Sequence, residues 1–131
     1  MALVSVTRLR LRSLRFLPAF VWAAQRSSRQ ALASAGNLGV ITRKTRGLSF
    51  WTLSVWSDEK AMAAFRAASP HREAMAKLAH WCDEGAVAHW QQDGKAMPDW
   101  TDAAAQLAAL GRLLRVDQPS AEQRAGRINT D

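Results

Sequence analysis

Three histidines are the side chains of this sequence best suited to proton transfer or ligation near neutral pH: His71, His80 and His89. They follow one another at intervals of nine residues, which is not the close helical spacing H-x-x-x-H that brings two ligands to one metal ion. The single cysteine, Cys82, is typical of a small buried side chain rather than of a thiol cluster. We therefore expect no zinc site.

His71 is the strongest single candidate for catalysis. It shares a helical stripe with Met75, Leu78 and Cys82, so its side chain is expected to face a sheet and any pocket there. It also lies in the first turn of its helix, where the positive end of the helix dipole disfavours the charged imidazolium. A neutral imidazole suits a general base or a ligand to a metal or haem. The alternative is a structural role, in which His71 only hydrogen-bonds the start of the helix.

The other polar candidates are weaker. His89 belongs to an expected strand and faces either a pocket or a dimer seam, and a structural role is favoured for it. His80 lies off the inner stripe of its helix and is expected to be exposed. Arg72 follows His71 directly and is predicted to bind a carboxylate or hydroxyl group of a substrate, with a plain surface charge as the alternative.

Aromatic side chains predict a site for a flat organic molecule. The chain has six tryptophans and no tyrosine. Indole rings line such pockets, although they more often anchor cores and interfaces. Trp22 and Trp51 are expected nearest to a cleft between helices and sheet, and together with Phe65 and Met75 they form the predicted substrate-binding set.

Charge and missing motifs exclude several classes of function. No Ser-His-Asp arrangement, paired carboxylates or Gly-rich phosphate loop is present, so hydrolase, glycosidase and nucleotide-binding functions have no support. Residues 1–57 hold nine basic and no acidic side chains, and the whole chain carries a net charge of +7. This asymmetry indicates a solvated basic face or steering of an anionic substrate. Nucleic-acid binding ranks last, because no motif for it accompanies the charge.

Periodic patterns predict the elements that position these side chains. Alternation predicts strands over residues 3–11, 38–42, 48–56 and 86–91. Helical spacing predicts helices over residues 17–35, 58–67, 70–82 and 101–116. The order βαββαβ plus a C-terminal helix is typical of the ferredoxin-like α+β fold, with a four-stranded antiparallel sheet and helices on one face.

The strand over residues 48–56 predicts how the sheet is covered. It places large apolar groups on both faces, with Phe50 and Trp56 on one and Trp51 and Leu53 on the other. A sheet with one face in water would alternate apolar and polar side chains. We therefore expect helices on one face and a second copy of the chain on the other, which makes a face-to-face homodimer.

Length and composition fit one domain. The chain has 131 residues, of which 48% are apolar. We expect one domain over residues 1–116 and a polar, flexible tail over residues 117–131. No apolar run reaches the roughly 18 residues that span a bilayer. The basic and apolar N-terminus is similar to a targeting peptide, but the fold needs its strand, and the unpaired cysteine favours the cytoplasm.

Two runs of residues resemble a known superfamily. The run Ser49 to Glu59, followed by Ala61-Met62, Phe65 and Ser69-Pro70-His71, is similar to the third strand and following helix of the antibiotic-biosynthesis-monooxygenase superfamily. A T-x-W-x-S/D-x-x-A-M/F-x-x-F run is typical there. The run Phe65 to Trp90 resembles its spheroidene-monooxygenase-like branch. The resemblance spans residues 2–92 and is more specific for fold than for reaction.

This resemblance implies a dimeric α+β barrel and a small monooxygenase-like enzyme. Its substrate would be a flat, mostly apolar organic molecule between helices and sheet, with His71 as general base or ligand. The superfamily includes cofactor-free oxygenases and haem-degrading enzymes, so the implied cofactor is either none or haem.

Residue by residue, the haem-degrading branch fits poorly. Its axial histidine aligns near Met75 and its haem-distorting tryptophan near Phe65, so neither is retained. His71 lies one turn earlier and is the candidate replacement ligand. Haem binding and a non-catalytic, dimeric ligand-binding or interaction protein are the two alternatives to the monooxygenase.

Overall fold

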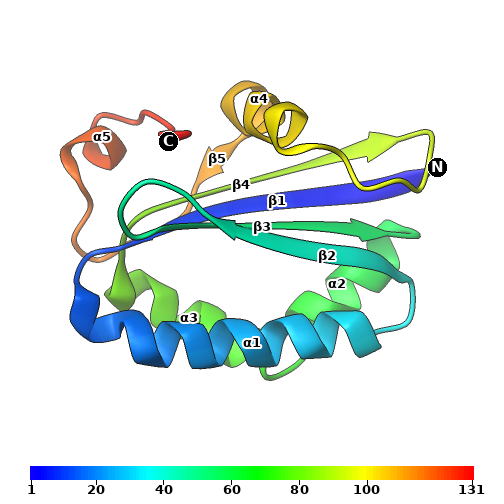
Figure 1. Cartoon of the computed structure of the whole chain (residues 1–131), viewed down its shortest axis with the longest axis horizontal. Coiled ribbons are helices and arrows are strands. Elements are labelled where there is room, and N and C mark those ends of the chain that lie inside the picture. The colour runs from blue at the N-terminus through cyan, green and yellow to red at the C-terminus, as the bar shows by residue number, and fades with distance from the viewer.

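The computed structural model describes residues 1–131 as an antiparallel sheet between two layers of helix (Figure 1). The sheet has five strands in the order β2-β3-β1-β4-β5. The strands are β1 (Ala2–Leu11), β2 (Asn37–Lys44), β3 (Ser49–Trp56), β4 (Cys82–Gln92) and β5 (Arg112–Leu113). The helices are the short η1 (Leu14–Phe16), α1 (Leu17–Ala33), α2 (Glu59–Ala67), α3 (His71–Trp81), α4 (Trp100–Leu110) and α5 (Ala121–Arg124).

The predicted ferredoxin-like α+β fold is confirmed, with differences at its C-terminal end. The last helix ends at Leu110 rather than at Val116, and residues 112–113 pair with β4 as a fifth strand. A two-residue strand is too short to produce an alternating pattern. None of the helices combines the length and the apolar character that crossing a bilayer requires.

Strand β1 runs through the middle of the sheet and divides its side chains between two faces. It pairs with β3 on one side and with β4 on the other. Val4 and Val6 point to α4 and are fully buried in the main apolar cluster. Ser5 and Thr7 point to the layer of α1, α2 and α3. The period of two in this strand therefore separates an apolar core from a polar face.

The sheet face that we expected a second copy to cover is covered by α4 of the same chain (Figure 1). Ala103 and Leu107 of α4 are fully buried against Val4, Val6 and Leu53. We had expected no helix of the same chain on this face, and that expectation was wrong. The pattern of one strand shows that a face is covered but not which element covers it. A homodimer stays a prediction, but this face is already used within the chain.

The C-terminal tail, predicted to be flexible, contains α5 and makes specific contacts with the sheet. The backbone carbonyl of Asp131 accepts hydrogen bonds from Nε of Arg8 at 3.1 Å and from the hydroxyl of Thr45 at 2.8 Å. The hydroxyl of Ser120 donates to Glu84 at 2.6 Å. These contacts tie the last residues of the chain to β1 and β4.

A buried ion pair lies beneath this tail. The guanidinium of Arg8 contacts the carboxylate of Glu84 at 2.8 Å and donates to the hydroxyl of Ser49 at 2.9 Å. Burial opposes ionisation of Glu84, but the hydrogen bonds from Ser120 and Arg8 and the charges of Arg10 and Arg8 outweigh it and lower its pKa. The network is satisfied within the chain, which indicates a structural role.

Candidate functional site

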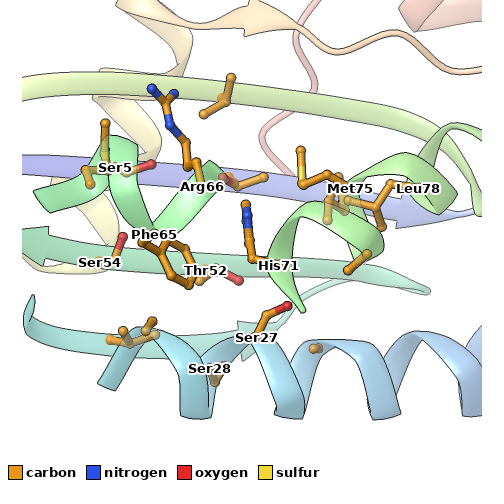
Figure 2. Close-up of a pocket in the computed structure, with 18 of the residues that line it drawn as sticks. Ser5, Ser27, Ser28, Thr52, Ser54, Phe65, Arg66, His71, Met75 and Leu78 are labelled. Atoms are coloured by element: carbon orange, nitrogen blue, oxygen red, sulfur yellow. The ribbon is translucent and has the colours of Figure 1, made fainter. Parts of the chain in front are cut away.

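A cavity of about 180 Å³ lies between the sheet and the layer of α1, α2 and α3 (Figure 2). At one end it meets the apolar cluster around Trp56 and Met62, and at the other end the cluster around Phe20 and Cys82. The two clusters hold the helices on the sheet at both ends. The space between them is left open.

The floor of this cavity is a band of polar side chains across three strands. Ser5 is opposite Ser54 on β3 and opposite His89 on β4, and Thr7 is opposite Thr52. All five side chains line the cavity. Helices normally cover a sheet face through apolar side chains, and buried polar groups are costly unless they are hydrogen-bonded. Hydroxyls in the middle of such an interface therefore favour a binding site over a packed core.

One side chain of α1 fixes the position of His71. The amide oxygen of Gln30 accepts a hydrogen bond from the backbone N–H of His71 at 2.7 Å. The amide nitrogen of Gln30 donates to the carbonyls of Phe65 at 3.1 Å and Ala68 at 3.3 Å. Gln30 thus holds the end of α2 and the start of α3 together, and so places His71 at the cavity.

The imidazole of His71 has unused hydrogen-bonding capacity. Its Nδ1 is buried and has no partner in the protein. Burial is the main cause that lowers the pKa of His71 below its usual value. A hydrogen bond with the backbone of Arg66 raises this pKa in part, and the positive charge of the Arg66 side chain lowers it further. The ring is therefore neutral near pH 7, which is the form that accepts a proton.

The aromatic ring of Phe65 lies beside this imidazole (Figure 2). The ring of Phe65 lies 4.4 Å from that of His71, measured between centroids, at an angle of 42°. Phe65 also stacks on Trp56, with centroids 5.1 Å apart and an angle of 30°. A wall of this kind suits contact with a flat ring.

Positive charge dominates the β4 side of the cavity. Arg66 and Arg112 line the cavity, and no acidic side chain does. His89 lies on the same side, and its pKa is lowered first by burial and then by the charges of Arg66 and Arg112, while Glu59 acts in the opposite direction. The cavity therefore combines neutral imidazoles with cationic groups.

The structure brings together half of the residues predicted for the site. His71, Phe65 and Met75 line the cavity, whereas Arg72, Trp22 and Trp51 do not. Trp51 is fully buried on the opposite face of the sheet, where its ring contacts Trp100 with centroids 6.4 Å apart. Large aromatic side chains stand on both faces of β3, so aromatic content alone did not show which face met the pocket.

Trp22 and Arg72 are exposed and point away from the cavity. Trp22 is 63% exposed. Its neighbours on α1, Phe20 and Ala24, face the sheet and line the cavity instead. Arg72 follows His71 on α3 but is exposed, since consecutive helical residues point in directions about 100° apart.

Sequence reasoning missed the polar band and the two arginines. The signal for the band was present: Ser5 and Thr7 alternate with Val4 and Val6, and Thr52 and Ser54 alternate in the same way on β3. Hydroxyl groups at alternate positions of two central strands favour a polar pocket under the helices. No comparable signal exists for Arg112, which belongs to a strand of two residues.

Haem does not fit this cavity. Its volume of about 180 Å³ is close to that of a cavity that holds one benzene ring, roughly 150 Å³. The macrocycle of a haem is several times larger than one such ring. His71 also lies against Phe65, with centroids 4.4 Å apart, so that ring occupies space beside the imidazole. We therefore derive no step through haem.

Several solved structures share this fold. A conserved protein from Methanosarcina mazei Go1 matches with a TM-score of 0.64 and 14% identity, over 71% of this chain and 94% of that chain. A putative antibiotic biosynthesis monooxygenase from Nitrosomonas europaea matches with a TM-score of 0.63 and 15% identity, over 70% and 89%. SnoaB, a cofactor-independent oxygenase from Streptomyces nogalater, matches with a TM-score of 0.60 and 14% identity, over 75% and 98%.

These matches show that the chain shares the fold of a putative antibiotic biosynthesis monooxygenase and of a cofactor-independent oxygenase. The spheroidene-monooxygenase-like branch stays a prediction. No curated protein matches the sequence. One family model matches residues 13–120, which is most of the chain, and its description is Domain of unknown function (DUF3291). The chain therefore belongs to the DUF3291 family.

Proposed function

We propose that this protein is a small, cofactor-free monooxygenase that oxidises a flat, mostly apolar molecule in the cavity, with His71 as general base. One observation carries the proposal: the ring of His71 lines the cavity with a buried Nδ1 that has no partner. A buried polar atom without a partner is rare unless a ligand supplies one. The similarity in fold to a cofactor-independent oxygenase also supports the proposal.

The size of the cavity limits the substrate. About 180 Å³ suits one aromatic ring with small substituents. The ring would lie against Phe65 and Leu78, and its oxygen substituents would face the hydroxyls of Ser5 and Thr52. These hydroxyls both donate and accept hydrogen bonds, so they orient the substrate relative to His71.

The proposed reaction begins with proton transfer to His71. The neutral imidazole removes a proton from an acidic CH₂ or hydroxyl group of the substrate, and the resulting anion spreads its charge over the ring. The electron-rich carbon then forms a bond to O₂, and the resulting peroxide anion takes the proton back from His71 to give a hydroperoxide. For a CH₂ group, loss of water from the hydroperoxide leaves a carbonyl, so one oxygen atom enters the product and the other leaves as water. O₂ is the oxidant, and no other electron donor is needed.

Oxygen uptake tests this proposal. Chelator-treated protein is mixed with indanone and hydroquinone, each a molecule with one aromatic ring and an acidic hydrogen, and uptake is compared with the spontaneous rate. We expect His71→Gln to lower turnover by about 10²- to 10⁴-fold, the usual contribution of a general base. His80→Gln is the matched control, because His80 is exposed and does not line the cavity.

Two results would contradict the proposal. Unchanged turnover in His71→Gln, on a substrate that the wild-type protein oxidises, would remove the role of His71. Saturable binding of these molecules without any oxygen uptake would instead favour the non-catalytic ligand-binding protein.

A homodimer also belongs to the proposal, as an expectation from the resemblance. Because α4 covers one face of the sheet, its interface would lie on another surface. Light scattering of the full chain during size-exclusion chromatography measures its mass. A mass near 14.5 kDa, that of one chain, would contradict the dimer.

A further inference from the structure

The charged side chains that line the cavity are all positive, which favours an anionic ligand. Of the 24 residues that line it, two are arginines and none is acidic. The five ion pairs of the chain involve other cations, namely Arg8, Arg10, Arg115 and Arg127. Arg66 and Arg112 are therefore free to pair with a ligand.

Arg66 and Arg112 both line the cavity although they are far apart in the sequence. Arg66 is in the last turn of α2, and Arg112 is on β5 opposite Val87 of β4. Figure 2 shows the side chain of Arg66 extending from α2 in the direction of β4. The charges of both arginines act on His89, two residues along β4 from Val87. His89 therefore feels both positive charges, and the charge of Glu59 acts against them.

The opposite part of the cavity is apolar. Leu9, Phe20 and Leu78 line it at the end where the cluster around Cys82 begins. A ligand that fills the cavity thus meets apolar side chains at one end and guanidinium groups beside β4. Guanidinium groups pair with planar carboxylates through two parallel hydrogen bonds.

We propose that the cavity binds a one-ring aromatic carboxylate, with its carboxylate held by Arg66 and Arg112 and its ring between Phe65 and Leu78. The neutral ring of His89 and the hydroxyl of Ser5, which are opposite each other in the sheet, lie next to the carboxylate and donate to it. This inference names the substrate class for the proposed function and rests on the same site.

A binding assay tests this inference without any turnover. Benzoate and benzamide have nearly the same shape, but only benzoate is charged, and isothermal titration calorimetry measures the affinity for each. We expect benzoate to bind at least about tenfold more tightly, since hydrogen bonds to a charged group are stronger than those to a neutral one. Arg66→Gln and Arg112→Gln should each remove most of this preference, because the affinity for benzoate falls further than that for benzamide.

Arg72→Gln is the matched control, because Arg72 carries the same charge, is exposed and does not line the cavity. It should leave the preference for benzoate intact. Equal affinities for the two ligands, no saturable binding of benzoate, or an equal loss in Arg72→Gln would overturn the inference. This assay measures binding and no oxygen uptake. A negative result would therefore contradict the carboxylate preference without contradicting the oxygenase reaction.

Discussion

The side chain of Gln30 accepts a hydrogen bond from the backbone N–H of His71 at 2.7 Å, across 41 positions of the sequence. This bond replaces a cap at the start of α3, where the preceding Pro70 has no side-chain oxygen to offer. The same amide group binds the last turn of α2 through Phe65. The cavity wall that carries Phe65 and His71 is therefore fixed by one residue of α1.

Gln30→Ala should weaken both the fold and the site. It leaves the N–H of His71 and the carbonyl of Phe65 without their partner, which costs about 1–3 kcal/mol of unfolding free energy. Urea unfolding measures this loss, and ligand affinity should fall with it because His71 is no longer held. Gln25→Ala changes an exposed glutamine on the same helix, and it should change neither the unfolding free energy nor the ligand affinity. Equal effects of the two substitutions would remove the positioning role.

Thr52→Val tests whether the polar band serves a ligand. The two side chains have nearly the same shape, so the fold should be as stable as before or slightly more so, because a hydroxyl under the helices becomes a methyl group. Affinity for hydroquinone, whose hydroxyls would face this band, should fall several-fold through the lost hydrogen bond. Thr42→Val is the control, since Thr42 is opposite Thr52 on β2 but is exposed. A large loss of stability without a change in affinity would mean that the band is structural.

Glu84→Gln should be strongly destabilising. Arg8 and Glu84 are each 2% exposed, and removal of one charge leaves the other buried without a partner. Such a change costs about 3–5 kcal/mol of unfolding free energy, measurable by urea titration. Glu122→Gln changes the partner of Arg127 in an exposed pair of similar length, 2.7 Å, and should have a far smaller effect. Similar effects in both variants would show that the buried network is not structural.

Leu107→Ala tests the contact between α4 and the sheet. Leu107 is fully buried against the main apolar cluster, so its truncation should cost about 2–5 kcal/mol of unfolding free energy. Leu110→Ala on the same helix is the control, because Leu110 is 55% exposed and should tolerate the change. Comparable losses in both would mean that α4 does not cover this face in solution.

The sequence predicted the order of elements well because each element carries its own signal. Val4 and Val6 alternate with Ser5 and Thr7 along β1, and this alone identifies a strand with two unlike faces. His71 was found because its spacing from Met75 places both on one helical face. Local periodicity fixes such relationships within one element.

The sequence did not predict which helices and strands lie next to each other. Trp51 was placed near the pocket, although α4 covers its face of β3. Arg66 and Arg112 line the same cavity only because α2 packs on the sheet and β5 pairs with β4. The contacts of Asp131 with Arg8 join the two ends of the chain, which no local pattern reveals.

Protein stability should depend on pH through the two cavity histidines. Burial lowers the pKa of His71 and of His89 in the folded protein, so the unfolded chain binds more protons once the pH falls below the usual value near 6.5. Unfolding free energy should therefore be greatest above that value and fall as the pH drops towards about 5.5. Denaturant titrations of the wild-type protein and of His71→Gln measure this; the slope with pH should be smaller in the variant.

The central claim is that His71 is a neutral base in the cavity, and a titration of its imidazole by nuclear magnetic resonance tests it most directly. The signals are assigned by their loss in His71→Gln and are followed in the wild-type protein across the histidine range. The account predicts a midpoint below the usual value of about 6.5, with the ring uncharged at neutral pH. A midpoint at or above that value would contradict it, because the ring would then be solvated or paired with an anionic group.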